Sequence, residues 1–220
     1  MLPSSFVPTG SRARLATAFL AATIAIDVVA IGSDVGEISA INRYLDGTDF
    51  STGPLVSSDH RQQVVGVLQI AALALTAIVF IRWFHAAYRN LSSLGVSELR
   101  FKPGWAIGAW FVPFLSLWRP KQIADDICRA SEPEQPDSSP RTPNYLLNSW
   151  WAFWLLSLFV GNASGRVLFK ANTLTDIRDA AKVDIAAMAF DITAAVLAIL
   201  VIRHITNRQL DRAQLLAAEA

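Results

Sequence analysis

The sequence has one cysteine, Cys128, and few charged residues. A single thiol cannot form an intrachain disulfide, and it cannot supply a cysteine-based zinc site, which needs several thiolates. Charged residues make up 17% of the 220 positions and the formal net charge is +1. A dedicated nucleic-acid binder needs a clustered basic excess to neutralise phosphates, so we do not expect nucleic acid among the partners.

The sequence also lacks the motifs that mark common catalytic sites. It has no Gly-rich phosphate loop, no HExxH pair and no GxSxG nucleophile elbow, and residues 161–165, GNASG, have the wrong spacing for the last of these. Scattered serines and aspartates without a positioned base do not make a site. We therefore expect no enzymatic activity, no metal and no cofactor.

Apolar residues, in contrast, are abundant at 53% of the chain. A hydrocarbon core of roughly 30 Å takes about 17 to 25 helical residues to cross. Four stretches are long and apolar enough: 15–33, 64–81, 146–169 and 183–202. The predicted fold class is all-α, a polytopic membrane protein with four transmembrane helices in a single membrane domain, 1–220. The first stretch could instead be a cleaved signal peptide, although we favour an uncleaved helix.

Lysine and arginine collect on one side of these four stretches. The N-terminal arm, the loop between the second and third stretches and the C-terminal tail together contain 13 of the 19 basic residues, whereas the first connecting loop contains five acids. Because cytoplasmic segments carry the excess of Lys and Arg, the pattern predicts that both termini are cytoplasmic.

Residues 101–118 are apolar but unsuited to an ordinary span. The core of this segment, 104–118, would reach only about 22 Å as a helix. Pro113 would interrupt such a helix, and a fifth span would move the Arg-containing tail to the outside, against the charge bias. We expect a re-entrant or interfacial element here, with a fifth span as the alternative.

The flanks of this segment show further helical patterns. The helix of the second stretch is expected to continue to about residue 94 and to stop near Gly95, with Arg82, His85 and Arg89 on one face. An amphipathic surface helix is predicted over 120–130, and a disordered linker over 131–144. All seven tryptophans fall near the expected cytoplasmic boundary, which predicts an interfacial belt or, alternatively, a groove that binds a ligand or partner.

An ordered series of aromatic, proline and glycine positions runs through this region. It comprises Arg82-Trp83, Tyr88-Arg89-Asn90-Leu91, Leu94-Gly95, Phe101, Pro103-Gly104-Trp105, Trp110-Phe111-Val112-Pro113 and Leu117-Trp118-Arg119-Pro120, followed by Trp150-Trp151 and Trp154. In these residues the sequence closely resembles the domain-of-unknown-function 4328 family of bacterial integral membrane proteins. The resemblance implies a bacterial plasma-membrane location and no known activity.

Ionisable residues inside the expected spans are the best pointer to chemistry, because a charge in hydrocarbon is costly unless it is paired or hydrated. Asp27, Arg166 and Asp191 lie at similar depth, and Asn162 precedes Arg166 by one helical turn. We predict an intramembrane polar cluster of these four residues. It could be an ion-pair network that fixes helix register or a proton or ion relay; alternatively, Asp27 and Arg166 simply reach the interface.

His85 and His204 follow the second and fourth stretches at similar depth. Two facing imidazoles in a helical bundle can ligate haem iron, but interfacial histidines are commoner than haem ligands. We therefore discount a haem site.

Two function classes remain. The first, which we favour, is an interaction or scaffold protein. Its cytoplasmic platform combines residues 101–118, which we call the aromatic segment, with a basic surface formed by Arg82, Arg89, Arg119 and Lys121. Its partners would be the lipid bilayer, anionic lipid head groups, another membrane protein or a second copy of the chain. The second class is a small transporter or channel subunit that uses Asp27, Arg166 and Asp191.

Overall fold

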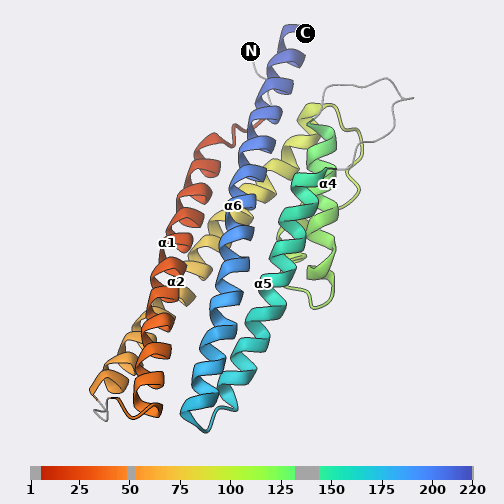
Figure 1. The fold of residues 1–220 in the computed structure, drawn as a ribbon. Helices are drawn as coiled ribbons and strands as arrows, with labels where there is room; N and C mark the ends of the chain where they lie inside the picture. Colours follow the sequence, from red (N-terminus) through yellow and green to blue (C-terminus); the bar gives the residue numbers. More distant parts are fainter. Residues whose placement is uncertain (1–5, 49–52, 132–143, 220) are drawn as a thin grey trace. The chain divides into compact units, whose positions relative to one another are not determined.

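The computed structural model describes residues 6–48, 53–131 and 144–219, and helices account for most of them. No strand occurs in these ranges, so the all-α prediction is confirmed. Figure 1 shows four long helices, α1, α2, α5 and α6, and the short α4. In chain order the elements are α1 (Gly10–Leu45), α2 (Gly53–Arg89), η1 (Asn90–Leu94), α3 (Trp105–Gly108), η2 (Leu115–Leu117), α4 (Arg119–Ala130), α5 (Tyr145–Phe169) and α6 (Leu174–Glu219).

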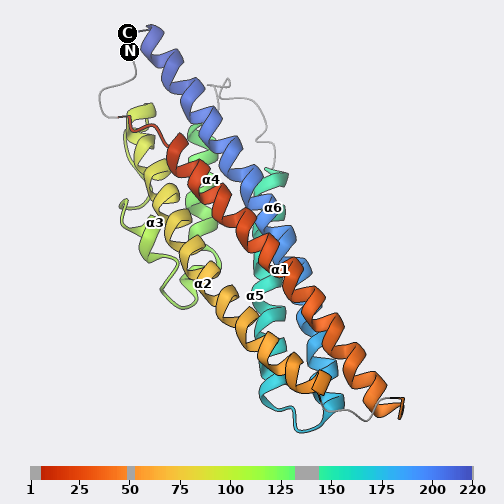
Figure 2. The same ribbon diagram turned by 90° about the vertical axis from the view of Figure 1, so that its left-hand side faces the viewer.

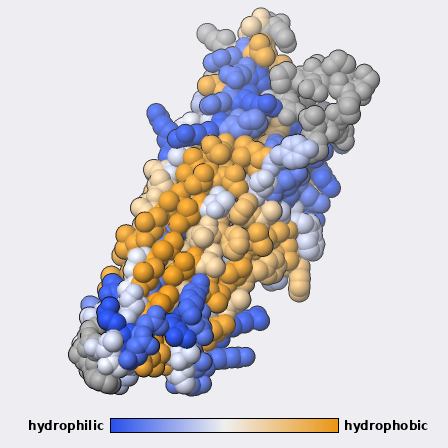
Figure 3. Space-filling model, in the orientation of Figure 1, coloured by the Kyte–Doolittle hydropathy of each residue, from blue (hydrophilic) through white to orange (hydrophobic). Residues whose placement is uncertain are grey.

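The four long helices account for the predicted membrane spans. Each contains a stretch that is long and apolar enough to cross a membrane, so the chain is a multi-pass membrane protein. Figure 3 shows hydrophobic side chains along the middle of the long helices and hydrophilic ones near their ends. On α2, Val67, Ile70 and Leu73 are each more than 60% exposed, as side chains that face lipid would be.

The helices are longer than the predicted spans because their polar ends also pack. The first span was predicted over 15–33, yet α1 continues to Leu45. From residue 33 onward, polar side chains of α1 form hydrogen bonds with polar side chains of α2. Arg61 donates to the Ser33 hydroxyl at 2.8 Å, and Gln62 donates to the Asp34 carboxylate at 2.6 Å. These bonds stabilise helix that apolar periodicity alone does not predict.

The segment 101–118 forms no long helix. It contains one turn of α3, a series of turns and η2, and it is not among the helices that could cross a membrane. A fifth span is therefore not formed. Phe114, directly after Pro113, has a backbone φ of 64°, a left-handed conformation that is unfavourable for a residue with a Cβ.

The boundaries predicted around this segment can be located individually. The helix that continues from α2 ends at Gly95, which adopts a φ of 92°. The predicted helix 120–130 is α4, with Pro120 in its first turn. Its apolar side, Ile123, Ala124 and Ile127, is fully buried against protein. The predicted linker 131–144 falls almost wholly on residues 132–143, which lie outside the described residues.

The chain divides into two compact units. Unit 1 comprises Met1–Phe19, Thr76–Trp151 and Leu197–Ala220, and unit 2 comprises Leu20–Leu75 and Ala152–Val196. Unit 1 thus includes both terminal segments, the aromatic segment and α4. Unit 2 includes both short connections, from α1 to α2 and from α5 to α6.

Unit 1 is built around aromatic side chains. Trp83, Phe84 and Tyr88 of α2 are at most 1% exposed, and the Trp83 indole donates to the Thr206 hydroxyl at 3.1 Å. Six rings from three segments stack edge to face or tilted, with centroids 5.5 to 6.3 Å apart. They belong to Phe80, Trp83, Phe84, Trp110, Trp150 and Trp151. Figure 2 shows the segment that contains α3 beside the part of α2 that contributes to this cluster.

Unit 2 is packed with small residues and polar contacts. Ala30, Val65 and Met188 form a small buried cluster from three helices. The start of α6 is fixed by a reciprocal cap: the Asp176 N–H donates to the Thr173 hydroxyl, and the Asp176 carboxylate accepts from the Thr173 N–H, both at 3.1 Å.

Candidate functional site

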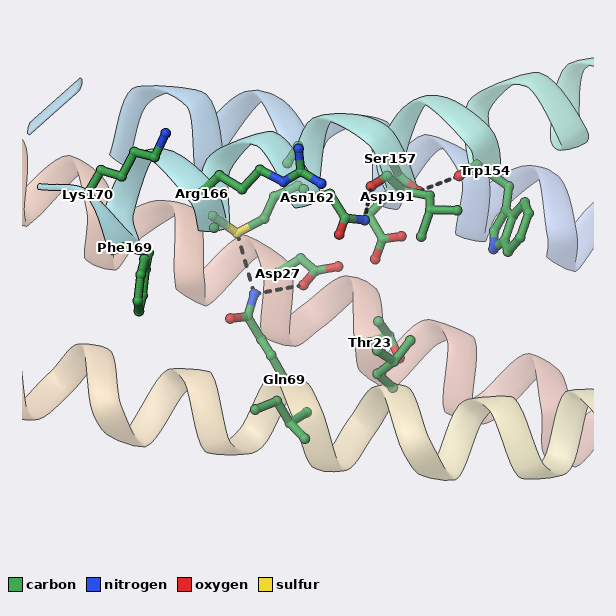
Figure 4. Close-up of a pocket in the computed structure, with 17 residues that line it drawn as sticks. Thr23, Asp27, Gln69, Trp154, Ser157, Asn162, Arg166, Phe169, Lys170 and Asp191 are labelled. Atoms are coloured by element: carbon green, nitrogen blue, oxygen red, sulfur yellow. Dashed lines mark hydrogen bonds between the residues drawn. The ribbon is translucent and has the colours of Figure 1, made fainter. Parts of the chain in front are cut away.

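A groove of about 750 Å³ lies within unit 2, lined by side chains of α1, α2, α5 and α6. Figure 4 shows polar side chains from all four helices converging on it. We call it the acidic groove. Its polar lining residues are Thr23, Asp27, Gln69, Ser157, Asn162, Arg166, Lys170 and Asp191, and its apolar lining includes Ile70, Leu73, Trp154, Leu158, Phe169 and Met188.

Two carboxyl groups meet on the wall of the acidic groove. Asp27 of α1 is 4% exposed, and its Oδ1 accepts a hydrogen bond from the Gln69 amide of α2 at 3.2 Å. Asp191 of α6 lines the same groove and lies close enough to Asp27 for the charges of the two carboxyl groups to interact. Ser157 of α5, whose hydroxyl donates to the Trp154 carbonyl at 2.9 Å, lies beside Asp191. Side chains from four helices thus surround the carboxyl pair.

The basic residues of the acidic groove do not neutralise this pair. Arg166 and Lys170 are exposed, and neither forms an ion pair within the part of the chain that the structure describes. The Asn162 amide donates to the Leu158 carbonyl at 2.7 Å, one turn back on its own helix. All four residues of the predicted polar cluster line one groove, but Arg166 forms an ion pair with neither aspartate.

A further aspartate of α6, Asp184, is not part of the carboxyl pair. Asp184 accepts a hydrogen bond from the Ser164 hydroxyl of α5 at 3.0 Å and does not line the groove. Within the described residues, no group of three or more His, Cys, Asp or Glu side chains could hold a metal ion. The chemistry available in the acidic groove is therefore that of two adjoining carboxyl groups beside amides and aromatic rings.

The residues of the predicted basic surface have different environments in unit 1. Lys121 pairs with Asp125 on α4 at 2.6 Å. The Arg119 guanidinium lies 4.3 Å from the Phe101 ring centroid and 5.5 Å from that of Trp105. Arg82 and Arg89 instead line a small pocket, together with Arg12 and His85.

The predicted Trp/Pro/Gly motif residues hold the aromatic segment in place within unit 1. The carbonyl groups of Pro103 and Gly104 accept hydrogen bonds from backbone N–H groups in the turn that opens α3. The Trp151 indole donates to the Leu117 carbonyl at 3.2 Å. The Tyr88 hydroxyl contacts both the N–H and the carbonyl of Phe101, at 3.0 and 3.1 Å. The other motif residues take part in the aromatic cluster (Trp110), precede the strained turn (Pro113) or open α4 (Trp118, Arg119 and Pro120).

Sequence reasoning missed residues of the acidic groove and of the small pocket in unit 1. Gln69 was not predicted, although an amide inside an otherwise apolar span is itself a signal of polar contact within a bundle. Nothing in the sequence indicates that Arg12 lines a pocket with residues 70 or more positions away.

Comparison with known protein families finds one match. The family described as a domain of unknown function, DUF4328, matches residues 46–207, well over half of the chain. The chain belongs to the DUF4328 family. The match covers the aromatic segment, Gln69, Arg166 and Asp191, while Asp27 and Arg12 precede it. Neither a curated protein nor a solved structure matches the chain. The resemblance inferred from the Trp/Pro/Gly motif is therefore confirmed, and any activity must be argued from the chain itself.

Proposed function

We propose that this DUF4328 chain is a small transporter or channel subunit that binds a lipophilic organic cation in the acidic groove. The observation that carries the proposal is that Asp27 and Asp191 line one groove among apolar helices, with no basic residue paired to either among the described residues. Two adjoining carboxylates in hydrocarbon repel each other and lose hydration, so a proton or a cation between them is needed to offset the cost.

The chemistry is an exchange of one proton for one cation. Without a solute, one proton shared by the two carboxyl groups would relieve their repulsion, and the pair would carry one negative charge. When a monovalent cation binds, the proton leaves and both carboxylates become charged. The carboxyl pair plus its bound proton, and the carboxyl pair plus its bound cation, therefore carry the same net charge.

The remaining lining suits a cation of this kind. Trp154 and Phe169 offer aromatic rings that attract a cation, and Ile70 and Leu73 offer apolar surface. The positive charges of Arg166 and Lys170 would keep the cation at the carboxyl end of the acidic groove. A lipophilic organic cation therefore fits better than a hydrated metal ion.

Calorimetric titration of the purified protein in phosphatidylcholine nanodiscs with tetraphenylphosphonium tests this function. We expect binding above that of empty nanodiscs, tighter at mildly alkaline than at mildly acidic pH because protons compete for the carboxyl pair. Asp27→Asn and Asp191→Asn should each weaken binding by about tenfold or more, which corresponds to about 1.4 kcal/mol.

Asp179→Asn is the matched control, because it changes an exposed aspartate of α6 outside the acidic groove and should leave the affinity unchanged. Buffers with different ionisation enthalpies should report release of about one proton per cation bound. Wild-type affinity in both Asp27→Asn and Asp191→Asn, or no binding above empty nanodiscs at either pH, would exclude the proposed function.

The proposed orientation places both termini in the cytoplasm of a bacterial plasma membrane. It is supported by the basic excess of unit 1, which includes both terminal segments. Single cysteines at His60 and Ala218, in a Cys128→Ser background, test it. An impermeant thiol reagent applied to intact cells should label the first position and not the second.

An interaction role is the second candidate, favoured by Phe111 and Phe114, which are 72% and 74% exposed on the aromatic segment. Exposed aromatic rings at this position suit contact with the lipid interface or with another membrane protein. An environment-sensitive dye on Phe114→Cys should be quenched by lipid-attached quenchers if the segment enters the bilayer. Emission as in water would exclude this contact with lipid.

A further inference from the structure

A second, smaller pocket lies in unit 1 and has the opposite chemistry. Its volume is about 220 Å³, and three arginines and a histidine line it: Arg12, Arg82, Arg89 and His85. No aspartate or glutamate is among its lining residues. We call it the basic pocket.

Local structure explains why these side chains converge. Arg82, His85 and Arg89 are spaced by three and four residues on α2, so they occupy one face of that helix. Arg12 lies in the first turn of α1, where unbonded N–H groups and the helix dipole add positive potential. Ile107 of α3 contributes apolar lining.

The pocket wall is held in place by the N-terminal arm. Asn90 is 1% exposed, and its amide makes two bonds with the backbone of Val7: the Val7 N–H donates at 3.1 Å and the Val7 carbonyl accepts at 2.9 Å. Both residues line the basic pocket. The arm that leads to Arg12 is thus fixed beside the end of α2.

Arg12, Arg82 and Arg89 of the basic pocket form no ion pair with any residue in the described ranges. Elsewhere in unit 1, Lys121 and Arg129 pair with aspartates on α4, and Arg119 stacks on aromatic rings. Guanidinium groups that converge without an acid repel one another unless an anion lies between them.

We propose that the basic pocket binds a phosphate group. Three guanidiniums offer forked N–H donors that match the geometry and the charge of a phosphate oxyanion. The phosphate could belong to the head group of an anionic lipid or to a soluble phosphate compound, and the same contacts would hold either. The proposal is independent of cation binding in unit 2.

Two binding measurements with the full-length protein in phosphatidylcholine nanodiscs test the site and distinguish the sources. Inorganic phosphate is titrated by microscale thermophoresis, and nanodiscs doped with phosphatidic acid are compared with undoped ones by thermal unfolding and by native mass spectrometry of retained lipid. We expect saturable phosphate binding, or retention of phosphatidic acid with a raised midpoint of unfolding. Replacing Arg12, Arg82 and Arg89 together by Gln should weaken either response by about tenfold or more.

Arg129→Gln is the control, because it removes an arginine of unit 1 that lies outside the basic pocket and should change neither response. The triple variant also carries its own check on folding: without anion its midpoint should be at or above the wild-type value, because the mutual repulsion is gone. Binding of phosphate alone would identify a soluble ligand, and retention of phosphatidic acid alone would identify a lipid. Responses equal in the wild type and the triple variant, or no response to either probe, would overturn the proposal.

Discussion

Units 1 and 2 of this DUF4328 chain differ in charge and in what they bury. Unit 1 contains 13 basic and 8 acidic residues, and unit 2 contains 6 basic and 10 acidic residues. Of the twelve largest fully buried side chains in the described ranges, all but Ile41 belong to unit 1. Buried polar side chains of unit 2 include Asp27, Ser33 and Asp34.

The difference suggests that stability and binding depend on different parts of this apolar chain. Large rings that fill a core stabilise a structure and leave little room, whereas small residues leave space that polar side chains can occupy. We therefore expect substitutions in unit 1 to act mainly on stability and substitutions in the acidic groove to act mainly on binding. Four predictions, from the largest expected effect to the smallest, test this contrast.

Trp83→Ala should have the largest effect on stability. It removes a fully buried ring and its hydrogen bond to Thr206, and we expect a loss of about 3–5 kcal/mol in the free energy of unfolding. Phe159→Ala in unit 2 is the comparison, because that ring is 59% exposed and its loss should have little effect. Denaturant unfolding in detergent micelles measures both, and equal losses would contradict the contrast between the units.

Tyr88→Phe should cost about 1–3 kcal/mol, because it leaves both the N–H and the carbonyl of Phe101 without their partner. Tyr145→Phe removes the same hydroxyl from a side chain that is 74% exposed and should be neutral. Limited proteolysis should cut Tyr88→Phe faster within residues 95–104. A Tyr88→Phe protein as stable and as resistant as the wild type would show that the hydroxyl does not hold the aromatic segment.

Asp27→Asn should leave stability unchanged or raise it by about 1 kcal/mol, because the amide takes the place of the shared proton and removes an ionisable group from a site where charge is costly. The same unfolding assay measures it, with the exposed Asp179→Asn as the control in unit 2. A loss larger than about 2 kcal/mol would instead indicate that the carboxyl pair is a structural contact that fixes helix register.

Asp126→Asn should have the smallest effect on stability, and this effect should depend on pH. Burial raises the pKa of Asp126 above its ordinary value, although the Arg129 guanidinium at 2.8 Å opposes the shift. The folded state therefore binds this proton more tightly than the unfolded state does, so the cost of the buried charge falls as the pH drops through the folded pKa. The variant should be more stable at neutral pH by less than about 1 kcal/mol, and its advantage should vanish in acid. An advantage that stays constant with pH would exclude this origin.

Composition and apolar length were sufficient to predict the fold class. The four spans, the stop at Gly95 and the helix after Pro120 each follow from local patterns, and the structure has all three. The extension of α1 to Leu45 and the start of α2 at Gly53 could not be predicted, because contacts between helices stabilise them, such as Arg61 with Ser33.

The site was predictable only in part. An ionisable residue within a span is visible in the sequence, so Asp27, Arg166 and Asp191 could be named. Which of them touch depends on how each helix is rotated about its axis, and the sequence of a single chain does not specify that rotation. The basic pocket is a similar case, since Arg12 and Arg89 are far apart in sequence and are brought to one pocket by tertiary contacts that include the bonds between Asn90 and Val7.

The hydrogen bonds that close unit 1 also bear on the order of biosynthesis. The Trp83 indole is bonded to Thr206, and the Ala87 carbonyl is bonded to the Gln209 amide, over separations of 123 and 122 residues. A ribosome must therefore translate nearly the whole chain before these groups on α2 can find their partners. Until then these polar groups of the nascent aromatic core lack their partners. A membrane insertase or chaperone that shields the core would therefore act mainly during this period.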